Sequence, residues 1–142
     1  MQLDKHTDYA LRILIALAAH SPDKLSIAQI AQMYGISANH LSKVATRLVQ
    51  GAFLMSERGR AGGLTLSRAA NQINVGNVVR MLKADTAVVE CLAEGGTCCI
   101  VPACGLRDPL LQAQEAFFAV LDRYSVADIA RNRSGLVALL PT

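Results

Sequence analysis

A tight turn between two short amphipathic segments places the strongest constraint on how this chain can fold. Ser26-Ile27-Ala28-Gln29 has the pattern of a capping box, in which a hydroxyl and an amide satisfy free backbone donors at a helix start. Gly35 suits the left-handed residue that follows such a helix, and Ser37 is placed to cap the next one. The sequence therefore predicts a short helix ending near Met33, a turn, and a second helix over residues 38–50.

The second of these helices has an apolar face and a polar face. Its apolar stripe consists of Leu41, Val44, Ala45 and Leu48. A helix with the opposite face polar can enter the major groove, where asparagine reads an adenine edge and lysine or arginine reads guanine or binds phosphate. A polar face that is only solvated is the alternative. The candidate DNA-contacting residues are Ser37, at the helix start, and Asn39, His40, Lys43 and Arg47.

A glycine-rich, basic segment follows and predicts a hairpin. Residues 53–57 and 64–67 are short strand candidates, joined by Arg58-Gly59-Arg60-Ala61-Gly62-Gly63. Glycine at Gly62 lets the backbone approach a phosphate or a minor groove, while Arg58 and Arg60 supply charge. The order of helix, helix, turn, helix and basic hairpin is that of a winged helix-turn-helix domain. The fold class is therefore mainly α with a small β-hairpin wing.

The remaining pattern divides the chain into three regions. A helix over 8–20 precedes the capping box, and Asn74 can cap a short helix over 75–82. Residues 83–104 show no sustained period and are expected to form a loop. A long helix is expected over 106–124, and Ser125 can begin a last short helix, with an uninformative tail. The expected regions are 1–82, the DNA-binding domain; 83–105, a cysteine loop; and 106–142, a dimerisation helix and tail.

The charge of the chain is distributed unevenly between its halves. Residues 1–70 hold eight Lys or Arg and four acidic residues, a net charge of +4, whereas residues 71–142 hold six and seven, a net charge of −1. The first half can therefore face a polyanion. The residues form no P-loop, no HExxH and no Ser/His/Asp order, so an enzyme is not expected. The start of the sequence lacks signal-peptide features and the chain has no transmembrane run, so we expect a cytoplasmic protein without a membrane partner.

All four cysteines lie within one glycine-containing segment. They are Cys91, Cys98, Cys99 and Cys104. Disulfides are uncommon in the cytoplasm, and three thiolates in a loop can hold a soft metal or an iron–sulfur cluster. Buried structural thiols are the alternative. No histidine lies between residues 41 and 142, so a fourth ligand is left to Cys99, a carboxylate, a distant group or another molecule.

At this point the chain resembles the family of small iron–sulfur winged-helix transcription regulators that includes IscR and NsrR, and within it the nitric-oxide-sensing branch. The resemblance covers nearly the whole chain. It is carried by Thr7-Asp8-Tyr9-Ala10-Leu11-Arg12, Ser37-Ala38-Asn39-His40-Leu41-Ser42-Lys43, the segment from Arg58 to Leu66, Pro102-Ala103-Cys104 and Tyr124-Ser125-Val126-Ala127-Asp128. The IscR-like branch has a histidine ligand three residues after the last cysteine, where this chain has Arg107.

The resemblance implies a cofactor and a mechanism. Cys91, Cys98 and Cys104 would hold an iron–sulfur cluster, with 4Fe–4S favoured over 2Fe–2S, and Asp8 of the other protomer would add an oxygen ligand. Cys99 is a departure from the family pattern and could replace Cys98. A homodimer built on the long helix would bind a palindromic operator and repress transcription until nitric oxide damages the cluster. Asp8, once released, could then pair with Arg12, one turn away.

Two other functions remain open from the sequence. The same kind of regulator could sense iron or redox state instead of nitric oxide. Outside gene regulation, the cluster could carry electrons for a partner oxidoreductase, although the basic hairpin and the polar helix face have no use in electron transfer.

Overall fold

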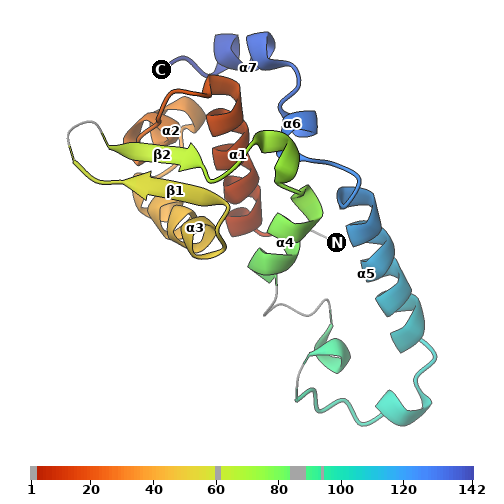
Figure 1. Ribbon diagram of the computed structural model, residues 1–142. Helices are drawn as coiled ribbons and strands as arrows, with labels where there is room; N and C mark the ends of the chain where they lie inside the picture. Colours follow the sequence, from red (N-terminus) through yellow and green to blue (C-terminus); the bar gives the residue numbers. More distant parts are fainter. Residues whose placement is uncertain (1–2, 60–61, 84–88, 94) are drawn as a thin grey trace.

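The computed structural model describes residues 3–59, 62–83, 89–93 and 95–142. Helix α1 (Lys5–His20) runs through the middle of the fold and packs against α3, α4, α6, α7 and β2 (Figure 1). Its residues Ala10, Ile13 and Leu14 have no exposed surface. The helix begins three residues before its predicted start because Asp4 caps it: the Asp4 carboxylate accepts a hydrogen bond from the backbone N–H of Thr7, at 2.8 Å.

The helix-turn-helix forms as the sequence predicts. Helix α2 (Ile27–Tyr34) starts with the complete capping box of Ser26 and Gln29, and Gly35 ends it in the left-handed conformation, at φ 63°. Helix α3 (Ala38–Gln50) has the predicted bounds. The prediction that Ser37 caps α3 is wrong in its chemistry: Ser37 occupies the N-cap position, but its side chain makes no capping hydrogen bond.

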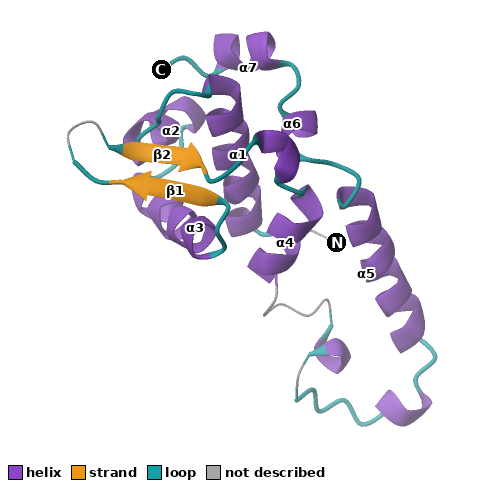
Figure 2. Cartoon of the chain, viewed as in Figure 1, coloured by secondary structure: helices purple, strands orange, loops and turns teal. Residues whose placement is uncertain are grey.

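The wing is a two-stranded antiparallel hairpin attached to the helical body. Strands β1 (Leu54–Glu57) and β2 (Gly63–Leu66) pair in the register Leu54 with Leu66 and Glu57 with Gly63 (Figure 2). Leu25, just before α2, exchanges two backbone hydrogen bonds with Leu64, at 2.8 and 3.2 Å. Because Leu25 extends the hairpin as a single-residue bridge, the position of the wing relative to α2 is set by backbone bonds.

The second half of the chain contains a long helix, α5, that extends away from the rest of the fold. It also contains short helices that the sequence did not predict. After η1 (Ala70–Gln72) come α4 (Val75–Lys83), η2 (Glu90–Leu92), η3 (Val101–Ala103), α5 (Arg107–Leu121), α6 (Val126–Ile129) and α7 (Arg133–Leu139). Asn74 caps α4 as predicted, accepting from Asn77 N–H at 3.0 Å. Figures 1 and 2 show α5 extending away from α1, with the cysteine segment between α4 and α5.

Helix α5 ends before the predicted Tyr124 because the chain turns there to pair with the start of α4. The N–H of Val75 donates to the carbonyl of Tyr124 at 2.9 Å, and the N–H of Val126 donates to Ile73 at 2.8 Å. Val126 is fully buried and joins the same core as α1. Val126 therefore belongs to the core that the DNA-binding region forms, and the expected three-part division stays a prediction.

The tail that looked uninformative in the sequence folds as α7 against α1. Asn132 caps this helix by accepting from Gly135 N–H at 3.2 Å. The Arg133 guanidinium donates to the carbonyl of Ala19 at 2.7 Å and also to the carbonyl of Ser21. A cation at a helix C-terminus satisfies free carbonyls and interacts favourably with the helix dipole. The C-terminal region thus caps the end of α1.

Gly76 is required where α4 meets the end of α5, and replacing it should destabilise the protein. A Cβ at this position would lie 1.9 Å from Asp122 Oδ1 and 3.1 Å from the Asp122 backbone nitrogen. Because Arg80 holds the same carboxylate at 2.7 Å, it cannot move without losing that ion pair. We expect Gly76→Ala to lower the free energy of unfolding by about 1–3 kcal/mol, measured by thermal and urea denaturation.

The matched control is Gly105→Ala, because a Cβ on Gly105 would meet nothing within 4 Å. Equal melting temperatures for the two variants would contradict the packing that we describe between α4 and Asp122.

Candidate nucleic-acid interface and cysteine segment

The polar face of α3 is free to meet a partner. Asn39, His40 and Lys43 are all exposed, while Leu41, Val44 and Leu48 on the other face are fully buried. The hydroxyls of Ser42 and Thr46 donate to the carbonyls one turn back, at 2.8 and 2.9 Å. Ser37, at the N-cap of α3, and Asn39, His40 and Lys43, in its first two turns, are therefore all exposed, as expected of residues that contact DNA.

Arg47 differs from these residues because its guanidinium contacts protein. Its Nη2 donates to the carbonyl of Leu82 near the end of α4, at 3.2 Å, and the residue is half-buried. The prediction that Arg47 contacts DNA is not tested by this bond. The bond to Leu82 ties the Arg47 side chain to α4, whereas Lys43, one turn earlier on α3, is exposed.

The backbone of the wing approaches Gly62 closely. A Cβ there would lie 2.3 Å from the Glu57 carbonyl, so only glycine fits. Gly59 has φ 107°, which also favours glycine, and Arg58 is exposed beside it. Arg60, the second predicted basic residue of the wing, lies outside the described residues. Lys24 forms an ion pair with Glu57 and connects the strand to the body.

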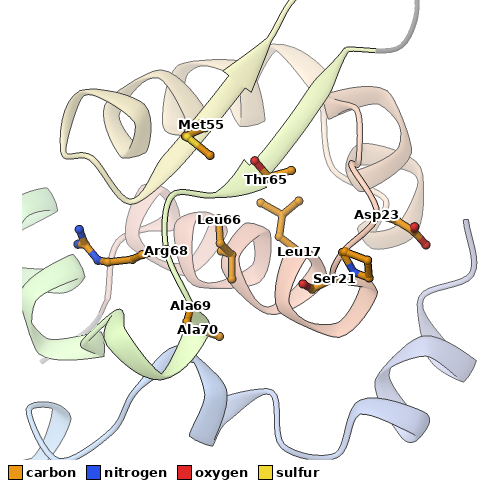
Figure 3. Close-up of a pocket in the computed structure, with 10 residues that line it drawn as sticks. Leu17, Ser21, Asp23, Met55, Thr65, Leu66, Arg68, Ala69 and Ala70 are labelled. Carbon is orange, nitrogen blue, oxygen red and sulfur yellow. The ribbon is translucent and has the colours of Figure 1, made fainter.

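A pocket of about 360 Å³ lies between the base of the wing and the end of α1. Leu17, Met55 and Leu66 line its apolar part, and Figure 3 shows its charged residues, Arg68 and Asp23, extending to opposite sides. The Arg68 guanidinium lies over the ring of Phe53, 5.6 Å from its centroid. Ligand sites usually combine an apolar lining with converging polar groups, and the charged residues of this pocket do not converge.

The outward face of α1 carries an ion pair that reaches α2. Arg12 Nη2 lies 2.9 Å from Asp8 Oδ2, and the Arg12 guanidinium lies over the ring of Tyr34 at 5.7 Å. The Tyr34 hydroxyl donates to the backbone carbonyl of Arg12 at 3.1 Å. Burial raises the pKa of Tyr34; Arg12 opposes this effect and Asp8 adds to it. Sequence reasoning missed Tyr34, although an aromatic residue just before Gly35 is a signal for packing beside the turn.

The start of α1 is also bonded to the end of α4. Lys83 Nζ lies 3.3 Å from Asp4 Oδ2, and the Lys83 side chain is only 17% exposed. Burial alone would raise the pKa of Asp4, but the N–H of Thr7 and the Lys83 ammonium together bring it below its ordinary value. The sequence analysis missed Asp4, although an Asp before an apolar-periodic segment is an N-cap signal.

The cysteine segment presents four free thiols. Cys91 lies in η2, Cys104 ends η3, and these two and Cys98 are half-buried, whereas Cys99 is exposed. Among the residues that the structure describes, no three His, Cys, Asp or Glu side chains come together as a metal site. The three predicted cysteine ligands thus lie in one segment, but their side chains do not converge on a common point. Asp8, the fourth predicted ligand, lies on α1, where it pairs with Arg12.

Comparisons with known proteins agree with this architecture. A family model described as Rrf2, iron-dependent transcriptional regulator, matches residues 3–132. The HTH-type transcriptional regulator NsrR of Bacillus subtilis is 46% identical, covering 99% of this chain and 97% of that protein, and NsrR of Oceanobacillus iheyensis is 39% identical with the same coverage.

Solved structures show the same fold. CymR, the global cysteine regulator of B. subtilis, matches with a TM-score of 0.73 and 26% identity, over 93% of this chain and 98% of that one. T. potens IscR matches with a TM-score of 0.73 and 21% identity, over 93% and 88% of the two chains.

The fold and the exposed α3 face place this protein among the winged helix-turn-helix transcription regulators, which are DNA-binding proteins and not enzymes. The chain belongs to the Rrf2 family of transcription regulators. Within the described residues, none of the helices has the length and apolar character needed to cross a membrane.

Removing the charge of Lys43 should weaken DNA binding. Lys43 is exposed on the α3 face, and each phosphate contact adds about one to the salt dependence of binding. We expect Lys43→Ala to raise Kd for a mixed-sequence duplex and to lower the slope of log K against log salt by about one. Fluorescence anisotropy over a salt series measures both.

Arg131→Ala serves as the charge-matched control, since Arg131 is an exposed residue in the connection between α6 and α7. An equal loss of affinity in the two variants would show that net charge, and not the α3 face, governs binding.

Proposed function

We propose that this protein is a transcriptional repressor that binds a palindromic operator as a homodimer and loses that binding when nitric oxide damages an iron–sulfur cluster. The observation that carries the proposal is the exposed face of α3, with Asn39, His40 and Lys43, beside a wing carrying Arg58. The relatives that match almost the whole chain are named HTH-type transcriptional regulator NsrR, which supports a transcriptional repressor.

The proposed dimer uses α5. This helix extends away from α1 (Figure 1), and large apolar side chains on it and beside its ends are exposed: Val120 is 48% exposed, Leu106 just before the helix 61%, and Tyr124 just after it 47%. Phe117 is half-buried beside Phe118, with the ring centroids 5.6 Å apart. A second copy packed on α5 would remove this apolar surface from water, which is the main favourable term in association. The dimer would also present two copies of the α3 face, one to each half-site of a palindromic operator.

The donor chemistry of the cysteine segment fits an iron–sulfur cluster. Cys91, Cys98 and Cys104 are half-buried thiols, and thiolate is the ligand such clusters require. These three residues would hold the cluster, with Asp8 of the second copy as the oxygen ligand. When bound, the cluster supplies iron that reacts with nitric oxide.

Asp8 and Arg12 would act as the switch between the two states. The Asp8 carboxylate pairs with Arg12 at 2.9 Å, and Arg12 contacts the Tyr34 ring that precedes the turn into α3. When the Asp8 carboxylate binds iron, it no longer pairs with Arg12. The Arg12 guanidinium would then change its contact with the Tyr34 ring. The proposed consequence is a change in the position of α3 relative to its twin in the dimer.

A second candidate signal is iron or redox state, since the same donors would serve either sensor. Iron and sulfide content and the visible spectrum of protein purified anaerobically distinguish the cluster types. A gel shift with an operator selected in vitro from random duplexes tests the switch. Cluster-loaded protein should bind the operator much more tightly than nitric-oxide-treated protein; equal binding by both would reject the proposal.

Asp8→Ala tests the oxygen ligand. We expect a changed visible absorption spectrum and a changed rate of cluster loss with nitric oxide, because one ligand is replaced. Asp23→Ala is the control, since Asp23 is an exposed acidic residue after α1. A spectrum identical to that of the unmodified protein would remove Asp8 from the ligand set.

Serine variants of the adjacent cysteines test which of them binds iron. Cys98 is half-buried and Cys99 exposed, so we expect Cys98→Ser to lose cluster iron and Cys99→Ser to retain it. Iron per protomer after anaerobic reconstitution is the measurement. The reverse result would assign the ligand to Cys99.

A further inference from the structure

Three parts of the molecule meet at the carboxyl end of α4. We use the term α4 junction for Arg47 of α3, Leu82 and Lys83 of α4, and Asp4 at the start of α1. Two side-chain bonds hold it together: Arg47 to the Leu82 carbonyl at 3.2 Å, and Lys83 to Asp4 at 3.3 Å. The cysteine segment follows Lys83 in the chain.

The bond from Arg47 has a clear physical role. The last carbonyls of a helix have no partner within it, and the carbonyl of Leu82 is one of them because α4 ends at Lys83. A guanidinium there satisfies the carbonyl and interacts favourably with the negative end of the helix dipole. The same end of α3 also abuts α4: a Cβ on Gly51 would lie 2.8 Å from Met81 Cε.

The bond from Lys83 extends the connection to α1. Asp4 caps α1 through the N–H of Thr7 and is therefore fixed relative to that helix. Asp8, the proposed iron ligand, lies one turn further along α1. A displacement of the start of α1 would thus act on the end of α4 through Lys83, and on α3 through Arg47.

We propose that Arg47 is a positioning residue that couples the state of the cysteine segment to α3, instead of contacting DNA. This inference rests on the proposed function, because it assigns the route by which that switch reaches the DNA-binding helix. Lys43, on the same helix, is the contrasting residue: it is exposed, whereas Arg47 is half-buried and bonded to α4. The bond links α3 to the element that precedes the cysteines.

The experiment compares operator affinity in two states. Kd is measured anaerobically for cluster-loaded and nitric-oxide-treated protein, for the unmodified chain, Arg47→Met, Arg47→Lys and Lys43→Ala. Methionine keeps the apolar stem and loses the donors, while lysine restores a charged donor. Circular dichroism checks that each variant is folded.

We expect Arg47→Met to reduce the ratio of the two Kd values by about fivefold or more, the lower end of ordinary coupling between sites. Arg47→Lys should recover part of the ratio. Lys43→Ala should weaken both states equally and leave the ratio unchanged. The salt slope should stay constant in Arg47→Met and fall by about one in Lys43→Ala.

An unchanged ratio in Arg47→Met, or a salt slope that falls as in Lys43→Ala, would overturn the inference while leaving the proposed function intact. Equal Kd values in both states of the unmodified chain would reject the proposed function and the coupling with it. If Arg47→Met does not fold, Lys83→Gln opens the junction without altering α3; the same reduced ratio is expected, and an unchanged one overturns the inference.

Discussion

The burial of α1 is the constraint on which the rest of this structure depends. Ala10, Ile13 and Leu14 have no exposed surface, and the elements packed against α1 come from both halves of the chain. Such close packing leaves little freedom for one neighbour to move without another. The ends of α1 are also held by polar bonds, with Asp4 at its start and Arg133 of α7 at its end.

This arrangement explains how the start of α1 and the end of α4 can be connected with the DNA-binding face of α3. Helix α1 contributes Asp8 and Arg12 to its outer surface and packs directly on α3. Two separate sets of contacts therefore lead from α1 to α3. Arg12 contacts Tyr34, which precedes the turn into α3. Asp4 pairs with Lys83 at the end of α4, where the Leu82 carbonyl accepts a hydrogen bond from Arg47 of α3.

Local signals predicted the helix-turn-helix well because caps and turns depend on neighbouring residues. Ser26 and Gln29 bond to each other, Gly35 adopts the left-handed φ that glycine favours, and Asn74 caps α4 by accepting from the N–H of Asn77, three residues away. The same logic failed for Ser37, whose hydroxyl makes no capping bond although its position is that of an N-cap. The glycine-rich wing was recognisable for a similar reason, since Gly62 cannot accept a Cβ beside Glu57.

The sequence by itself determined the winged helix-turn-helix, the exposed face with Asn39, His40 and Lys43, and the location of all four cysteines in one segment of the chain. Only the tertiary structure decided where α5 ends, that residues 133–139 form a helix, and that Arg47 bonds to Leu82. Helix periodicity and capping arise within a few residues, so they can be seen along the chain. The bond of Arg47 joins residues that are 35 positions apart, and only the packing of α3 against α4 brings its two atoms together.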